Sequence, residues 1–248
     1  ICLLPFEPEW FEIRGMPATF IGHPAMVQHE ISGNELPQGE SNIVLLPGSR
    51  ESEITKNLPM QQTILHRISE AFPGVEAVIA CRSEDVERVK PYANDLQIVA
   101  DDLPNVLEWA DLALNVSGTV SLHLMRHATP MIGMYKVKAL SMLGAKIMLN
   151  TQHRLLPNLI AGKQIVPEFI PCGNIAGKIA ELAVELLHDE EAMEEMRRQL
   201  QKEAAVYAPH DPSREAAEII RRGAADVIIS GGAEAAITPL TMAAFGNM

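Results

Sequence analysis

The feature that most constrains the fold is a regular alternation of short apolar runs and helical segments, which begins at Asn42. Runs rich in β-branched and aliphatic residues predict strands, and each is followed by a segment typical of a helix. Strands and helices that alternate at this spacing form a parallel sheet with helices on both faces. The strands are expected at 43–46, 76–81, 96–100, 112–116 and 131–135, and the helices at 59–72, from 83, at 103–110, up to 127 and at 138–150.

Two prolines and an aspartate mark expected helix starts. Pro59 suits the first turn of a helix, so the helix is expected to begin at this residue. Asp211-Pro212 combines a favoured N-cap with a proline at the first helical position, and predicts a helix to about Ile229. The other predictions are strands at 1–4 and 18–21, a loop or hinge at 25–41, a loop or short helical turn at 155–162, an extended run at 166–171, and helices at 175–188 and 190–207.

Composition excludes several classes of function. The formal net charge is −12, so no basic surface is expected that could neutralise nucleic-acid phosphates. Three widely spaced cysteines form neither a metal pattern nor a disulfide framework, which is typical of a reducing compartment. No apolar run reaches the roughly 18 residues of a membrane-spanning helix, and no signal peptide is found. The common ATP, NAD and serine-hydrolase motifs are absent.

One loop of interest follows the run at 43–46. Pro47-Gly48 interrupts the strand, and Ser49 and Arg50 come directly before a helical pattern. Backbone N–H groups at a helix start, together with a guanidinium, make a site for an anion such as phosphate or diphosphate. Alternatively, Arg50 forms only a surface ion pair with Glu51 or Glu53.

A second loop, Ser117-Gly118-Thr119, follows the run at 112–116 and also precedes a helix. Glycine lets a ligand approach the backbone, and the flanking hydroxyl and N–H groups can bind phosphate oxygens. The same residues would equally suit an ordinary helix cap. In parallel sheets ligands bind where strands lead into helices, so both loops are expected at one edge of the sheet.

Two polar residues further along stand in apolar surroundings. Asn158 lies between Pro157 and Leu159, and Glu168 lies between Pro167 and Phe169. Buried polar groups need hydrogen-bond partners, so each could bond the backbone or bind a sugar or phosphate. No spacing of His, Cys, Asp and Glu predicts a metal site, and no cofactor motif is present.

Several motifs, taken in chain order, resemble the lipid-A-disaccharide synthase family. The pairing of P-G-S-R with the later L-P-N-L-I-A-G and V-P-E segments is the most specific part, and the resemblance spans about residues 1–220. The motifs are Pro5-Phe6-Glu7, Phe20-Ile21-Gly22-His23-Pro24, Leu45-Leu46-Pro47-Gly48-Ser49-Arg50 with Glu53-Ile54, Ser117-Gly118-Thr119, Thr129-Pro130-Met131, Leu156-Pro157-Asn158-Leu159-Ile160-Ala161-Gly162 and Val166-Pro167-Glu168.

The resemblance implies an α/β fold of GT-B type, a Rossmann-like parallel sheet followed by a C-terminal helical segment. It implies the donor half of a metal-independent, inverting glycosyltransferase that needs no cofactor. Its donor would be UDP-2,3-diacylglucosamine and its acceptor 2,3-diacylglucosamine 1-phosphate, joined by a β-1,6 link. It also implies a cytoplasmic protein bound peripherally to the inner membrane of a Gram-negative bacterium.

The same resemblance suggests a domain division. Residues 1–40 would be the end of an N-terminal acceptor domain plus a hinge, and 41–210 the UDP-sugar-binding domain. Residues 211–230 would form a C-terminal helix and 231–248 a tail. Because the chain opens within a predicted strand, we expect it to be part of a longer protein whose acceptor site and catalytic base lie upstream of Ile1.

Transferred residue by residue, the resemblance implies that Arg50 and Asn158 are essential to catalysis. The implied donor-binding residues are Gly48, Ser49, Ser117, Gly118, Thr119, His123 and Glu168. Three positions depart from the family pattern, because His123 replaces a glutamate, Val27 an aspartate and Pro171 a glutamine. These departures leave open another UDP-sugar glycosyltransferase or epimerase of the same fold, or a degenerate, non-catalytic nucleotide-binding module.

Overall fold

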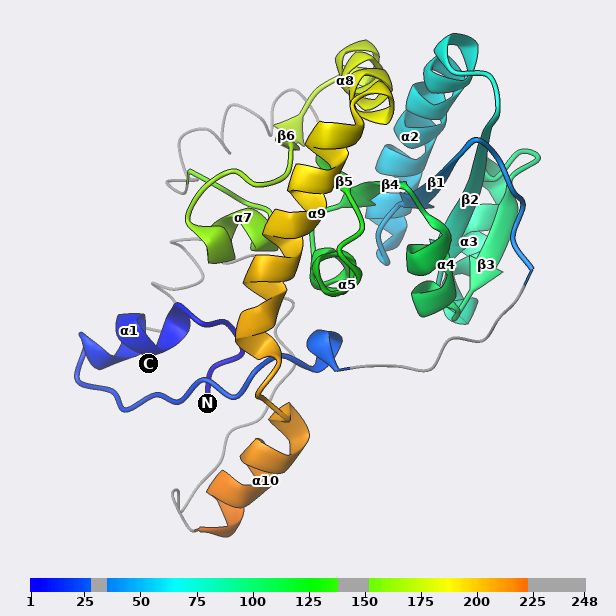
Figure 1. Ribbon diagram of the computed structural model, residues 1–248. Coiled ribbons are helices and arrows are strands. Elements are labelled where there is room, and N and C mark those ends of the chain that lie inside the picture. The colour runs from blue at the N-terminus through cyan, green and yellow to red at the C-terminus, as the bar shows by residue number, and fades with distance from the viewer. Residues whose placement is uncertain (28–34, 138–151, 223–248) are drawn as a thin grey trace.

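The computed structural model describes residues 1–27, 35–137 and 152–222 (Figure 1). Within these ranges six strands form a sheet in the order β3-β2-β1-β4-β5-β6, and all neighbours in it are parallel. The five predicted strands are confirmed, and the extended run at 166–171 contributes the sixth. The strands are β1 (Ser41–Leu46), β2 (Val75–Cys81), β3 (Gln97–Ala100), β4 (Leu112–Val116), β5 (Met131–Lys136) and β6 (Glu168–Cys172).

Helices cover both faces of the sheet, as predicted (Figure 1). On one face α2 (Glu51–Ala71) packs against α8 (Ala176–His188), and on the other α5 (Val120–His127) packs against α9 (Glu190–Ala204). The remaining helices are α1 (Glu7–Glu12), α3 (Val86–Val89), α4 (Leu103–Trp109), α7 (Leu156–Ala161) and α10 (Pro212–Arg221), with short 3-10 turns η1 (Pro24–Met26), η2 (Ser83–Asp85), η3 (Lys90–Tyr92) and η4 (Ala205–Tyr207).

The core is formed by the two central strands and the helices that cover them. Ile43, Leu45, Leu112 and Leu114 are completely buried. Strands that are covered on both faces are mostly apolar rather than alternating, which is why β1 contains the aliphatic run 43–46 and β4 the run 112–114.

A buried glutamine ties these two strands together where they end. Gln61 of α2 is completely buried. Its Nε2 donates to the carbonyl oxygens of Leu46 (3.2 Å) and Leu114 (2.9 Å). The strand order reverses between β1 and β4, so Gln61 joins the sheet at its topological switch point, where open α/β sheets bind ligands.

The predicted start of the first long helix at Pro59 is wrong. Helix α2 begins at Glu51, and Pro59 lies inside it. A proline inside a helix loses a hydrogen bond and costs about 3 kcal/mol. The turns before it bury Ile54 and Leu58 completely against the sheet, and burial of two large aliphatic side chains offsets that cost.

The predicted strands at 1–4 and 18–21 are also wrong. This segment forms only an isolated parallel bridge between Cys2 and Phe20. Its packing is instead with the segment before α10, because the Phe20 ring meets the rings of Tyr207 (5.4 Å) and His210 (4.6 Å) edge to face. Figure 1 shows this small body, with α1 and α10, below the sheet domain.

The start of α10 agrees with the prediction, since Asp211 is its N-cap and accepts a hydrogen bond from the Arg214 N–H. The part of this helix that we expected up to Ile229, the helix at 138–150 and the tail 231–248 lie outside the described residues.

Replacing Gln61 with leucine is expected to destabilise the domain. The two strand-end carbonyls lose this buried donor, so the free energy of unfolding should fall by about 1–3 kcal/mol in urea denaturation followed by circular dichroism. Lys56→Leu, at an exposed position of the same helix, should stay within about 0.5 kcal/mol. Equal unfolding midpoints for the two variants would contradict the role of Gln61.

Candidate functional site

The two predicted loops lie next to each other at the carboxyl edge of the sheet. Residues 47–50 follow β1, residues 117–119 follow β4, and Leu46 is directly paired with Asn115. The expectation that the fold brings these loops together is therefore confirmed. They flank the switch point, where neighbouring loops lead away in opposite directions and leave room for a ligand.

The 47–50 loop is wrapped around a carboxylate of its own chain. Glu53 Oε2 accepts hydrogen bonds from the backbone N–H groups of Ser49 and Arg50 (both 3.3 Å). Its Oε1 accepts from Arg50 Nη1 at 3.1 Å. The ion pair that the sequence left as one alternative is thus present, but its carboxylate is buried rather than on the surface.

Arg50 remains half exposed at this edge, with 51% of its side chain accessible. Burial and the Glu53 carboxylate raise the pKa of the Tyr135 hydroxyl, near the end of β5, while the Arg50 guanidinium acts in the opposite direction. An exposed guanidinium at a helix start can hold an anion and offset charge that develops on a leaving group.

The 117–119 loop is open. Gly118 and Thr119 are exposed, and a Cβ at position 118 would have no atom of the described residues within 4 Å besides its chain neighbours. Thr119 is the N-cap of α5 but makes no side-chain capping bond, whereas the Ser121 hydroxyl donates to the Gly118 carbonyl at 2.7 Å. The loop thus presents backbone and hydroxyl groups to any ligand that reaches it. His123 lies partly buried one turn into α5.

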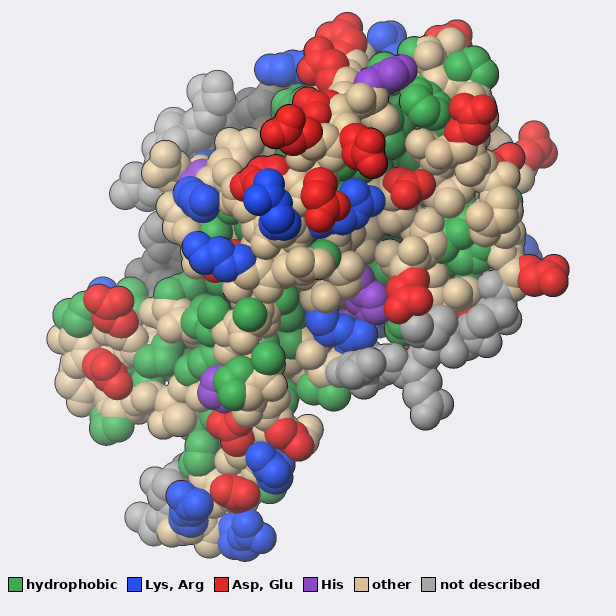
Figure 2. All heavy atoms as spheres, viewed as in Figure 1, with side chains coloured by type: hydrophobic (Ala, Val, Ile, Leu, Met, Phe, Trp, Pro, Cys, Tyr) green, Lys and Arg blue, Asp and Glu red, His purple; other side chains and the backbone are tan. Residues whose placement is uncertain are grey.

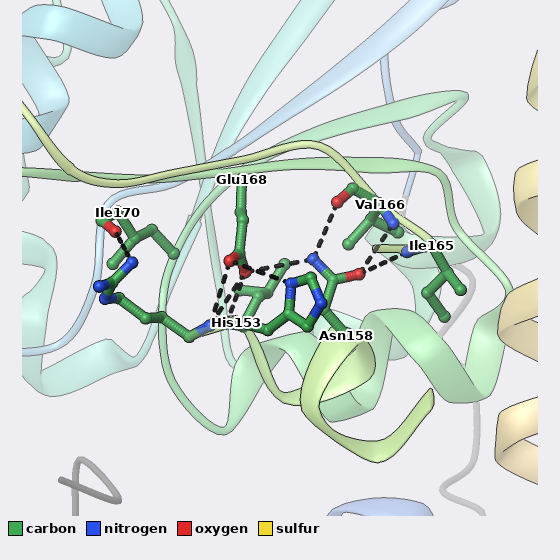
Figure 3. Close-up of polar contacts among 8 residues, drawn as sticks. His153, Asn158, Ile165, Val166, Glu168 and Ile170 are labelled. Carbon is green, nitrogen blue, oxygen red and sulfur yellow. Dashed lines mark hydrogen bonds and ion pairs between the residues drawn. The ribbon is translucent and has the colours of Figure 1, made fainter. Parts of the chain in front are cut away.

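Asn158 is completely buried in α7, and its amide bonds to protein groups on both sides (Figure 3). Its Oδ1 accepts from the N–H groups of Ile165 (2.7 Å) and Val166 (3.0 Å). Its Nδ2 donates to the Val166 carbonyl (2.9 Å) and to Glu168 Oε2 (3.1 Å). Asn158 therefore holds the segment that leads into β6.

Glu168 is a second carboxylate surrounded by donors (Figure 3). It accepts from the N–H groups of Arg154 (3.1 Å) and Leu155 (2.8 Å) as well as from Asn158, and His153 Nδ1 lies 3.7 Å from its Oε1. Only 9% of its side chain is exposed. Glu168, which follows α7 in the chain, therefore holds the residues that precede this helix.

The pairing of residues across the sheet relates the position of Glu168 to that of the 47–50 loop. Leu46 pairs with Asn115, Asn115 with Gly133, and Gly133 with Glu168. Glu168 therefore lies level with the end of β1 but three strands away, or about 14 Å across the sheet. The structure brings the loop of Arg50 and the 117–119 loop together, and places Glu168, with Asn158 bonded to it, three strands away at the start of β6.

Sequence reasoning missed three residues here. Glu53 was considered only as a surface partner of Arg50, although a glutamate at the third helical position is a known signal for a capping box. Gln61 and Tyr135 had no signal beyond a polar group in an apolar context. Their roles depend on which strands are neighbours.

The described ranges 1–27, 35–137 and 152–222 contain no group of His, Cys, Asp and Glu that could hold a metal ion. Within the same ranges no helix is long and apolar enough to cross a membrane. A shallow hollow lies near the starts of β4 and β5, at the sheet edge opposite the two loops and away from the usual ligand position. It is lined by Leu107, Glu108, Ala110, Asp111, His127, Ala128, Thr129, Pro130 and Arg197.

The sequence matches a known family over most of its length. The family described as lipid-A-disaccharide synthetase matches residues 1–221. The lipid-A-disaccharide synthase of Gluconobacter oxydans is 31% identical over 79% of this chain and 51% of that protein. That of Granulibacter bethesdensis is 30% identical over 91% of this chain and 62% of that protein. The chain thus spans little more than half the length of these curated relatives.

Solved structures share the fold. The spinosyn rhamnosyltransferase SpnG in complex with spinosyn aglycone aligns with a TM-score of 0.53 at 13% identity, covering 85% of this chain and 52% of that one. The glycotransferase of kitacinnamycin aligns with a TM-score of 0.50 at 18% identity, covering 82% and 48%. The expected GT-B type of fold is confirmed.

Asn158→Ala is expected to destabilise the protein more than the loss of a single hydrogen bond would. The variant leaves the Ile165 and Val166 backbone groups without their buried partner, so the free energy of unfolding should fall by about 2–3 kcal/mol. The measurement is urea denaturation, with Gln164→Ala, an exposed amide nearby, as the control within about 0.5 kcal/mol. If both variants unfold alike, Asn158 does not hold this segment.

Proposed function

The chain belongs to the lipid-A-disaccharide synthase family, and from this premise we propose that it is the donor-binding half of a glycosyltransferase. The reaction would transfer 2,3-diacylglucosamine from UDP to 2,3-diacylglucosamine 1-phosphate. The product is a β-1,6 disaccharide formed with inversion, and UDP is released. No metal or other cofactor takes part.

The observation that carries this proposal is the pair of loops at the switch point, with Arg50 half exposed in the first of them. A leaving UDP gains negative charge as its bond to the sugar breaks. Without a metal, that charge needs a protein cation and oriented backbone dipoles. Arg50 provides the cation, and the open 117–119 loop provides N–H and hydroxyl groups for the diphosphate or ribose.

The other donor-site residues take supporting roles in this proposal. Gly48 and Ser49 shape the loop that carries Arg50. His123, one turn into α5, lies where a family glutamate would meet the ribose, so this end of the site handles the nucleoside differently. Asn158 and Glu168 hold the backbone around α7, and we propose that Asn158 is essential because it positions this segment.

An exposed apolar surface outside the sheet supports a contact with a further domain. Among the described residues, the large hydrophobic side chains that are exposed lie within 1–27 and 206–220, and Figure 2 shows hydrophobic side chains gathered on the small body below the sheet. We propose that this surface meets the acceptor domain, which would carry the acceptor site, the catalytic base and the contact with the cytoplasmic face of the inner membrane. These side chains are Ile1, Leu3, Ile13, Met16, Val27, Val206 and Ile220.

The proposal predicts that the chain binds UDP and that Arg50→Ala weakens this binding at least tenfold. The loss should be specific for the diphosphate, because a charge-assisted contact of about 1.5–3 kcal/mol disappears. Isothermal titration with UDP and with uridine measures it. Arg82→Ala removes an arginine that is 56% exposed and paired with Glu84 and Asp85 at the same sheet edge, and should leave both affinities unchanged.

Two results of this titration would overturn the proposed donor site. One is the absence of any UDP binding by the unmodified chain. The other is an equal loss of UDP affinity in the Arg50 and Arg82 variants, which would reflect net charge alone.

A further prediction concerns catalysis. We expect residues 1–248 to bind the donor without forming disaccharide, and a longer protein that includes the acceptor domain to form it. Product analysis with radiolabelled acceptor distinguishes the two. Disaccharide formed by residues 1–248 alone would place the base and the acceptor site within this chain. A longer protein that binds UDP but transfers no sugar would indicate a non-catalytic nucleotide-binding module.

A further inference from the structure

We propose that Glu53 is a positioning residue of the donor site, which orders the 47–50 loop and sets the Arg50 guanidinium for the diphosphate. This inference rests on the donor site proposed above. Two backbone N–H groups of the loop, those of Ser49 and Arg50, already donate to Glu53. We therefore expect them to order the loop rather than to bind the ligand.

The contacts of Glu53 exceed those of a helix cap. A capping glutamate reaches back to the N–H of the N-cap residue, which here is Arg50. Glu53 also accepts from the preceding Ser49 N–H and from the Arg50 guanidinium. Three hydrogen bonds thus converge on one carboxylate whose side chain is 8% exposed.

The backbone of the loop is shaped around this carboxylate. Gly48 has a φ of +95°, a conformation that side chains with a Cβ rarely adopt. A Cβ at this position would lie only 2.5 Å from Glu53 Oε2. The glycine is therefore required twice, by the turn and by the close approach of the carboxylate.

Glu53 is also fixed from the other side. Asn57, one turn further along α2 and completely buried, donates from Nδ2 to the Glu53 carbonyl at 2.9 Å. Its Oδ1 accepts from the Lys136 N–H at 2.8 Å. The first turn of α2 is thereby tied to the end of β5, so the carboxylate has a fixed position relative to the sheet.

The fixed carboxylate of Glu53 restricts the orientation of the Arg50 side chain. A buried carboxylate needs a partner, and the guanidinium is a planar group with five donors. Its contact with Glu53 through Nη1 restricts the rotamers of a long side chain, while half of that side chain stays exposed. A cation that is already oriented loses less conformational entropy when it binds a diphosphate.

A double-mutant cycle on this chain tests the inference by titration with UDP and with uridine. The variants are Glu53→Gln, Arg50→Ala and the two combined. Glutamine can still accept the backbone N–H groups, but it no longer attracts the guanidinium. The matched control is Glu51→Gln, which removes an exposed carboxylate from the same helical turn. Thermal denaturation checks that each variant is folded.

We expect Glu53→Gln to weaken UDP binding about tenfold, or about 1.4 kcal/mol, and to leave uridine binding unchanged. In the Arg50→Ala background the same change should have an effect of about twofold or less, because Glu53 acts through Arg50. Glu51→Gln should change neither affinity.

Three outcomes would overturn the inference while leaving the donor site intact. They are unchanged or tighter UDP binding by Glu53→Gln, an equal loss of uridine binding, and a loss that adds fully to that of Arg50→Ala. If the unmodified chain binds no UDP, the proposed donor site fails, and the inference fails with it.

Discussion

The parallel pairing of β1 with β4 determines where the other parts of the candidate site lie. The direction of the strand order reverses between these two strands, so their loops stand side by side and lead into helices on opposite faces. Gln61 holds the two strand ends together from within the core. Without this pairing, Arg50 and the 117–119 loop would belong to separate parts of the surface.

Two glutamates whose side chains are largely shielded from solvent perform the same physical task, one beside each of two loops. Glu53 accepts the backbone N–H groups of the 47–50 loop, and Glu168 accepts those of the chain entering α7. A buried N–H group without an acceptor and a buried carboxylate without donors both cost free energy, and here each satisfies the other. The loops are thereby ordered by the protein itself, and Arg50 stays half exposed at the same sheet edge as the 117–119 loop.

Much of the architecture could be predicted because strands and helices impose local periods on apolar residues. The central strands are recognisable from aliphatic runs alone, and the cap of α10 from Asp211 and Pro212. The start of α2 could not be predicted, because burial of Ile54 and Leu58 in the folded core outweighs the local cost of Pro59. The apolar run at 18–21 makes only a bridge for a similar reason, since Phe20 packs against Tyr207 and His210 from the other end of the described chain.

The sequence by itself determined the class of fold, the two loops at the strand ends and the motifs that place the chain in its family. Only the tertiary structure decided what the polar residues do. In the folded chain Glu53 accepts the hydrogen bonds that order the 47–50 loop. Asn158 and Glu168 accept and donate the hydrogen bonds that hold the chain on both sides of α7. The physical reason is that the spacing of apolar residues can be read from a short stretch of sequence. The partner of a buried polar group, by contrast, depends on which distant segments the sheet brings together.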